Sequence, residues 1–157
     1  MLQESPKVNT IITDASCFIL FDNIGCLDVL QRLYLRVVTT PEIAKEYGKS
    51  LPEWVIVKSV ENLALLNTYS AIVALGEASA IALAIEVVSP LLILDDLKGR
   101  NLAESFNLAY TGTIGVLISA KKQGIIHSLK PYFEKIAATD FRIPANFLKT
   151  LLVKYDR

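Results

Sequence analysis

The chain has 157 residues, of which 52% are hydrophobic and 20% are charged. This length suits one ordinary domain of about 100–200 residues, and the apolar fraction is enough for a large core. The composition excludes intrinsic disorder, which needs low hydrophobicity and a large charge imbalance. Sixteen basic and sixteen acidic residues cancel, so no strong overall field attracts the protein to nucleic acid or to an anionic membrane. We expect one domain over residues 1–157.

Neither a membrane span nor a targeting segment is expected. The longest uncharged stretch, 105–120, contains an asparagine, two threonines and two glycines, whereas a spanning helix needs about 20 mostly apolar residues. The N-terminal sequence MLQESPKVNT lacks the apolar centre of a signal peptide. Cys17 and Cys26 are too few for a disulfide framework or a cysteine metal site. These features favour a reduced, cytoplasmic protein.

The expected elements alternate between short apolar strands and helices. In chain order they are a strand over 8–13, two helical pieces that begin at Ser16 and divide at Gly25, a strand over 35–39, a helix over 42–47, a strand over 54–60, helices over 63–75 and 77–88, a strand over 91–94, and helices over 101–109, 112–122, 128–137 and 144–152. Thr40 and Pro41 are favourable N-cap and first-turn residues. Alternation at this spacing indicates an α/β fold with a parallel sheet and helices on both faces.

Three acidic positions are unusual for their surroundings. Asp14 follows the first strand, and Asp95 follows the strand over 91–94. In an open parallel sheet, ligands bind in the crevice at the carboxyl ends of the strands, so both side chains should lie at one edge. Glu77 lies in the first turn of its helix, and it shares a face with the apolar Ile81. Taken singly, each acid is explained by a helix cap, a helix dipole or a turn.

Taken together, the acids predict a bound cation. Two carboxylates about 4 Å apart repel each other by roughly 4 kcal/mol at an effective dielectric constant of 20. Raised pKa values or a bound cation must relieve this repulsion. Oxygen ligands without His or Cys select a hard ion such as Mg²⁺ or Mn²⁺. A fourth acid is expected from the helix over 42–47, where Glu42 and Glu46 are both candidates, and Glu46 is favoured because dipole effects do not explain an acid near a helix end.

The chain resembles the PIN domain, in particular its compact prokaryotic branch related to the toxin ribonucleases of toxin–antitoxin pairs. The resemblance rests on the segments IITDASCFILFDNIGCLDVL, VVTTPEIAKEYGK, LGEASAIALA, LLILDDLKGRNLAESFNLAYTGTIGVLISAKKQGII and FRIPANFLKTLL. It implies a three-layer α/β/α sandwich with a mainly parallel central sheet. It also implies a Mg²⁺- or Mn²⁺-dependent nuclease site. Many relatives have Thr or Ser before the last acid, where this chain has Leu94.

By this resemblance, the catalytic and metal-binding residues are carboxylates: Asp14, Glu46, Glu77, and Asp95 or Asp96. Ser16 matches a hydroxyl residue that supports such sites, and Lys98 and Arg100 are candidates for contacts with the substrate. A salt bridge from Arg100 to an acid such as Glu104 is the structural alternative. The implied activity is metal-assisted hydrolysis of phosphodiester bonds in single-stranded RNA, and the implied partners are a second copy of the chain and a possible antitoxin.

Two other functions compete with this interpretation. The first is a catalytically inactive PIN-like module that binds nucleic acid or protein. The second is a phosphoryl-transfer domain, but receiver domains have their acid pair on the first strand, and aspartyl phosphatases have a second Asp where this chain has Ser16. A Rossmann site is excluded because no glycine triplet follows the first strand. His127, the only histidine, is expected to be structural or on the surface.

Overall fold

The computed structural model describes residues 10–156, so residues 8 and 9 of the first expected strand and the N-terminal segment lie outside it. The strands are β1 (Thr10–Thr13), β2 (Arg36–Thr39), β3 (Val55–Val57), β4 (Pro90–Ile93) and β5 (Ala109–Thr111). The helices are α1 (Ala15–Asn23), α2 (Asp28–Leu33), α3 (Pro41–Tyr47), α4 (Leu63–Ser70), α5 (Leu75–Glu86), α6 (Leu97–Ser105), α7 (Thr113–Lys122), α8 (Lys130–Ala137) and α9 (Ala145–Tyr155).

The strands form one parallel sheet with the order β3-β2-β1-β4-β5. This arrangement confirms the α/β class and the parallel sheet. The chain leaves β1 toward β2 on one side and leaves β4 toward β5 on the other. β1 and β4 are neighbours, so they flank a topological switch point, where ligands of open α/β sheets bind at the carboxyl ends of the strands.

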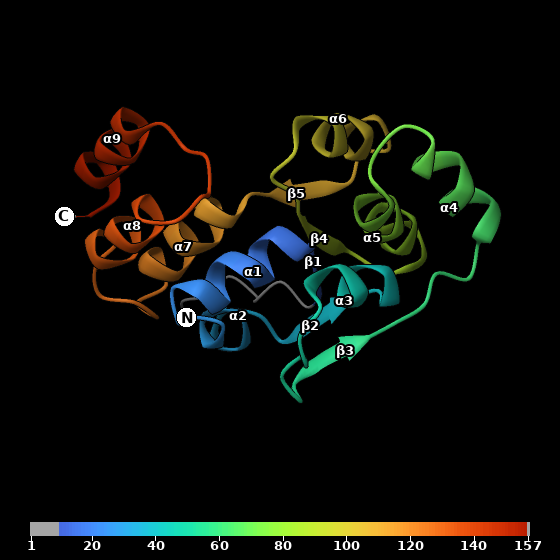
Figure 1. Cartoon of the computed structure of the whole chain (residues 1–157), viewed down its shortest axis with the longest axis horizontal. Coiled ribbons are helices and arrows are strands. Elements are labelled where there is room, and N and C mark those ends of the chain that lie inside the picture. Colours follow the sequence, from blue (N-terminus) through green and yellow to red (C-terminus); the bar gives the residue numbers. More distant parts are fainter. Residues whose placement is uncertain (1–9, 157) are drawn as a thin grey trace, which may run out of the picture.

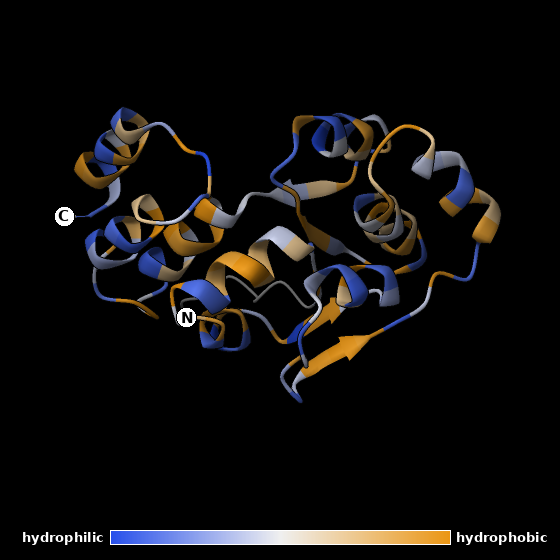
Figure 2. Ribbon diagram, viewed as in Figure 1, coloured by the Kyte–Doolittle hydropathy of each residue, from blue (hydrophilic) through white to orange (hydrophobic). Residues whose placement is uncertain are grey.

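Helices cover both faces of the sheet and complete the three layers. Figure 1 shows α1, α2 and α7 to α9 on one side of the sheet and α4, α5 and α6 on the other. The helix α5 packs against β1 and β4, and α6 packs against β5. All four residues of β1 are buried, β2 is buried after the exposed Arg36, and β3 is hydrophobic throughout (Figure 2). Between residues 10 and 156, no helix has the length and hydrophobicity needed to cross a bilayer.

The expected elements differ from the structure most in two places, and the strand expected over 54–60 is shorter, Val55–Val57. The helix predicted over 63–75 ends at Ser70, and α5 begins at Leu75, so Gly76 lies inside a helix rather than between two. The helix predicted over 101–109 ends at Ser105, and the strand β5 follows. Asn107 has a φ of 57°, a left-handed conformation that asparagine tolerates and that terminates helices.

Candidate acidic active site

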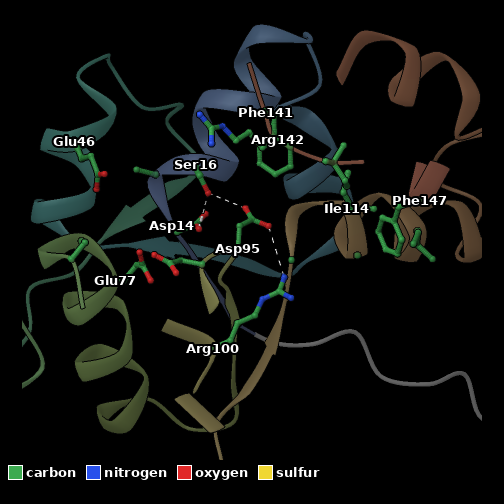
Figure 3. A pocket seen from close by; sticks show the side chains of 18 of the residues that line it. Asp14, Ser16, Glu46, Glu77, Asp95, Arg100, Ile114, Phe141, Arg142 and Phe147 are labelled. Atoms are coloured by element: carbon green, nitrogen blue, oxygen red, sulfur yellow. Dashed lines mark hydrogen bonds and ion pairs between the residues drawn. The ribbon is translucent and has the colours of Figure 1, made fainter. Parts of the chain in front are cut away.

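A pocket of about 660 Å³ opens at the carboxyl edge of the sheet (Figure 3). The five candidate carboxylates all line it: Asp14, Glu46, Glu77, Asp95 and Asp96. They follow β1, β2 and β4 or lie in the first turn of α5. The fold therefore brings acids that are up to 82 positions apart in the chain (14 to 96) into one cavity. Glu42, the alternative to Glu46, is outside the set of lining residues.

Asp14 is held in place by the beginning of α1. It is the N-cap residue, and its Oδ1 accepts a hydrogen bond of 3.0 Å from the backbone N–H of Cys17. Its Oδ2 lies 2.8 Å from the hydroxyl of Ser16. The residue is only 6% exposed. Asp14 is therefore both the helix cap and a pocket carboxylate, two roles that the sequence pattern presents as alternatives.

Asp95 is fixed by contacts from three elements. Its Oδ2 accepts hydrogen bonds of 2.9 Å from Ser16 Oγ and 2.6 Å from Thr113 Oγ1, and its Oδ1 accepts one of 2.8 Å from Thr113 N. Arg100 Nη2 lies 4.0 Å from Oδ1. Thr113 thus supplies the hydroxyl support that Leu94 does not provide, and Ser16 joins the carboxylates that follow β1 and β4.

Glu46 and Glu77 occupy space that glycines leave open. A Cβ atom at position 76 would lie 2.5 Å from Glu46 Oε2, and a Cβ atom at position 99 would overlap Glu77 Oε2. Glu77 Oε2 is buried and has no hydrogen-bond partner among residues 10–156. A buried, unpartnered carboxylate oxygen costs free energy, so this atom is a natural cation ligand.

The charged residues that follow Asp95 differ in whether they are exposed and whether they line the pocket. Asp96 is exposed at the N-cap of α6, where its Oδ1 accepts a hydrogen bond of 3.0 Å from Lys98 N. The exposed Lys98 is outside the set of lining residues, whereas Arg100 lines the pocket. Arg100 Nε donates a hydrogen bond of 2.6 Å to the carbonyl oxygen of Leu94. Arg100 therefore forms the salt bridge that was the structural alternative, but its acidic partner is Asp95 and not Glu104.

The carboxylates perturb one another strongly. Burial, and then the charge of Asp95, raises the pKa of Asp14 from 3.8 to about 7, although hydrogen bonds from Cys17 and Ser16 oppose this rise. Burial, and then the charges of Asp96 and Glu46, raises the pKa of Glu77 to about 7. The repulsion expected from the sequence is thus present in the folded pocket.

The residues present fit Mg²⁺ or Mn²⁺ by their chemistry. The available donors are carboxylate oxygens, which suit hard divalent cations, and Glu77 Oε2 is an orphaned buried acceptor. Within residues 10–156, no three His, Cys, Asp or Glu side chains already form a complete metal-ligand group. The residues that would hold an ion are Asp14, Glu46, Glu77, and Asp95 or Asp96.

Sequence reasoning missed the opposite wall of the pocket. This wall contains Phe141, Arg142 and Phe147, together with residues of α7 such as Ile114. Figure 3 shows Ile114 and Phe147 across the cavity from Glu46 and Glu77, and Arg142 beside Phe141 on the Ser16 side. Phe141, Arg142 and Phe147 lie in the segment FRIPANFLKTLL, which is part of the family resemblance, but nothing in its spacing or chemistry pointed to the pocket. His127 is exposed and is outside the set of lining residues.

The parallel sheet, the helices on both of its faces and the pocket of carboxylates at its switch point define an α/β domain with an acidic candidate active site. A family model described as a PIN domain (DUF3368) matches residues 10–157. The chain therefore belongs to the PIN domain family. PIN domains are typically nucleases that use divalent metal ions. No curated protein matches the chain.

Proposed function

We propose that the protein is a Mg²⁺- or Mn²⁺-dependent ribonuclease that hydrolyses phosphodiester bonds of single-stranded RNA. The observation that supports this proposal best is the meeting of five carboxylates in one pocket. Two of them, Asp14 and Glu77, have pKa values raised to about 7. Such a cluster is electrostatically unfavourable by itself and becomes favourable when a cation binds.

The chain's own residues hold and orient the reacting groups. When bound, Mg²⁺ or Mn²⁺ supplies Lewis-acid stabilisation of the phosphate and promotes the ionisation of water. Ser16 and Thr113 fix the orientation of Asp14 and Asp95, so these carboxylates need little reorganisation. Arg100 lies beside Asp95 and lines the pocket, where its guanidinium is placed to contact a phosphate oxygen.

The test is Mn²⁺-dependent cleavage of a mixed pool of single-stranded RNA. Asp14→Asn and Glu77→Gln should each reduce cleavage at least about 100-fold, because even residues that only support metal ligands contribute about 10–100-fold. Glu134→Gln is the matched control, since Glu134 is exposed on α8 and outside the pocket lining. Equal cleavage by the wild type and Asp14→Asn would overturn the proposal.

The alternative function is a PIN-like module that binds without cleaving. The exposed Arg142 and Phe147 at the pocket wall are groups that would serve binding alone, which favours this alternative. This alternative predicts RNA or protein binding that is unaffected by Mn²⁺ and by Asp14→Asn. The same RNA pool therefore distinguishes the two functions.

From the family resemblance, we further propose that the protein is a toxin that forms a homodimer and binds an antitoxin. This proposal predicts that expression of the wild type arrests bacterial growth, whereas Asp14→Asn does not. Arrest by both forms would separate toxicity from the acidic site and contradict this part of the proposal.

A further inference from the structure

The wall opposite the carboxylates is formed by the C-terminal part of the chain. The segment 141–143 and the helix α9 contribute Phe141, Arg142, Phe147 and Leu151 to the pocket. The same cavity thus has an acidic half and a half that combines aromatic rings with a cation. Its volume of about 660 Å³ falls in the range of about 300–1,000 Å³ that is typical of ligand sites.

The aromatic rings of this wall are available for stacking. Phe147 is 49% exposed, and Phe141 is partly buried. In the part of the chain that the structure describes, neither ring pairs with another aromatic ring, in contrast to Phe18 with Tyr47. Figure 3 shows Phe147 beside Ile114 and facing into the pocket. A flat apolar group can therefore pack against Phe147 without displacing a neighbour.

Arg142 is an unpaired cation at the same wall. It is exposed, and it forms no ion pair with any residue between 10 and 156. Arg100, in contrast, is bound to the Leu94 carbonyl and lies beside Asp95. Figure 3 shows Arg142 next to Phe141, on the Ser16 side of the cavity. Arg142 is thus the pocket cation whose charge is free to meet an anion.

We propose that this wall is a nucleotide subsite, in which Phe147 stacks on a base of single-stranded RNA and Arg142 binds a phosphate of the same strand. The inference rests on the proposed ribonuclease function. One nucleotide contains both a flat aromatic face and an anion, and stacking with a positive groove is the usual way in which proteins bind single strands. A phosphate of the same strand then lies toward the carboxylates, in the half where hydrolysis is proposed.

An apolar peptide of a protein partner is the rival occupant of the wall. An apolar peptide would use the apolar side chains but would leave Arg142 without an anion. A strand of RNA carries both a flat base and an anionic phosphate, so it uses both features of the wall. The combination of an exposed aromatic ring with an exposed cation therefore favours RNA over an apolar peptide.

The base contact is tested with a short, fluorescein-labelled single-stranded RNA and with versions in which one base at a time is removed. Fluorescence anisotropy is measured with Ca²⁺ in place of Mn²⁺. Removal of one particular base should weaken binding to the wild type at least about fivefold, the lower end of stacking effects. Phe147→Leu should bind the intact RNA correspondingly more weakly, and removal of that base should then have no further effect.

The phosphate contact is tested with Arg142→Gln. This variant should bind RNA of every sequence more weakly. The slope of the logarithm of the binding constant against the logarithm of the salt concentration should be smaller by about one. Arg142→Lys should retain part of the affinity. Phe106→Leu and Arg36→Gln are matched controls, because both residues are exposed and outside the pocket lining. Thermal unfolding verifies that each variant is folded.

The outcomes separate this inference from the proposed function. If the wild type cleaves RNA in Mn²⁺ but Phe147→Leu and Arg142→Gln bind and cleave like the wild type, the nucleotide subsite is wrong and the wall is a protein-contact surface. The subsite is also wrong if Phe147→Leu keeps the wild-type sensitivity to base removal. If the wild type neither binds nor cleaves RNA, the proposed function fails and the subsite fails with it.

Discussion

The hydroxyl of Ser16 lies 2.9 Å from Oδ2 of Asp95, which is 79 positions further along the chain. The same hydroxyl lies 2.8 Å from Asp14 Oδ2. A serine hydroxyl has a single proton to donate, so two ionised carboxylates cannot both receive it at the same time. Ser16 therefore joins the ends of two neighbouring strands and sets the separation of two carboxylates that repel each other.

Ser16→Ala should reduce Mn²⁺ affinity and RNA cleavage by about 10–100-fold, the usual effect of losing a group that orients metal ligands. The hydrogen bond from Ser16 lowers the pKa of Asp14, so its loss should raise that pKa further and shift the rise of activity to higher pH. Calorimetric titration with Mn²⁺ measures the affinity. Ser16→Thr is the control and should retain most of it. Unchanged Mn²⁺ binding by Ser16→Ala would contradict a positioning role.

The metal-free protein should lose stability as pH rises from about 4 to about 7. A carboxyl with a raised pKa keeps its proton in the folded state at pH values where the unfolded chain has released it, so the free energy of unfolding falls across this window. Asp14 and Glu77 both have a pKa of about 7. At about 1.4 kcal/mol per tenfold change in proton affinity, their ionisation should cost a few kcal/mol in total, and the smaller share comes from Glu77 because solvent screens its half-buried side chain. Urea denaturation at pH 5 and pH 8 measures this difference.

Asp14→Asn should remove much of this pH dependence and make the metal-free protein more stable at pH 8. Mn²⁺ should stabilise the wild type at pH 8 and have little effect at pH 5, where the carboxyls are protonated. A flat stability profile for the wild type would argue against the raised pKa values.

Gly99→Ala should separate stability from activity. An added methyl would overlap Oε2 of Glu77, which is the end of a side chain that can rotate away. Alanine is about 1 kcal/mol more favourable than glycine inside a helix, so stability should be retained or increased while cleavage falls. The control is Asn101→Ala, an exposed change on the same helix, which should leave cleavage unchanged. Full activity of Gly99→Ala would show that the position of Glu77 is unimportant.

Arg100 and Lys98 should behave differently, although both follow the same acid pair. Arg100 lines the pocket, and its Cζ atom lies 5.7 Å from the centre of the Tyr110 ring. Lys98 does not line the pocket. Arg100→Gln should lower kcat/KM for RNA at least about tenfold, because it removes a charge-assisted contact and loosens Asp95. Lys98→Gln should change it less than about twofold at moderate salt. Equal losses in the two variants would imply a general electrostatic effect instead.

Asp156→Ala should loosen the packing of α9 against the beginning of α8. The Asp156 carboxylate accepts hydrogen bonds from Ser128 Oγ, Leu129 N and Lys130 N. Burial opposes its ionisation, but these hydrogen bonds outweigh that effect and lower its pKa. Loss of such a cap costs about 1 kcal/mol. RNA binding should weaken because α9 contributes the wall with Phe147.

The pH dependence of stability tests the hydrogen bonds of the Asp156 carboxylate separately. A lowered carboxyl pKa stabilises the fold above its usual value of 3.8, and the stabilisation disappears as pH falls through the lowered value. The difference in unfolding free energy between the wild type and Asp156→Ala should therefore be full at pH 6 and vanish in strong acid. A difference that persists in strong acid would point to lost packing.

The elements that sequence patterns predicted well are those whose signals are local. Thr40 caps α3 through its side chain, Pro41 begins that helix, and Gly48 ends it with a φ of 74°, all as their residue types predict. The strand β5 was missed because three half-exposed residues after a helix have no periodicity to detect. Gly76 was taken as a helix break, but its lack of a side chain serves the Glu46 carboxylate instead.

Most of the acids were found from the sequence because they follow a buried strand or, for Glu77, lie in a first helical turn. Glu46 was found because dipole effects do not explain an acid near the end of α3. Their metal-binding and catalytic roles stay predictions. Thr113, Phe147 and Arg142 were not found, because their relation to the pocket depends on how α7 and α9 pack. Tertiary placement of this kind has no counterpart in local spacing. The acidic half of the pocket could therefore be predicted from the sequence, whereas the half formed by the C-terminal part of the chain could not.

The order of the strands also sets which parts of the protein open first. β1 lies between β2 and β4, whereas β3 and β5 are the edges. Amide hydrogens of residues 11–13 should therefore exchange with solvent slowest, and those of the edge strands and α9 fastest. Asp14 follows the central strand and Asp95 follows its neighbour β4, so local unfolding of the C-terminal wall should leave these two carboxylates aligned.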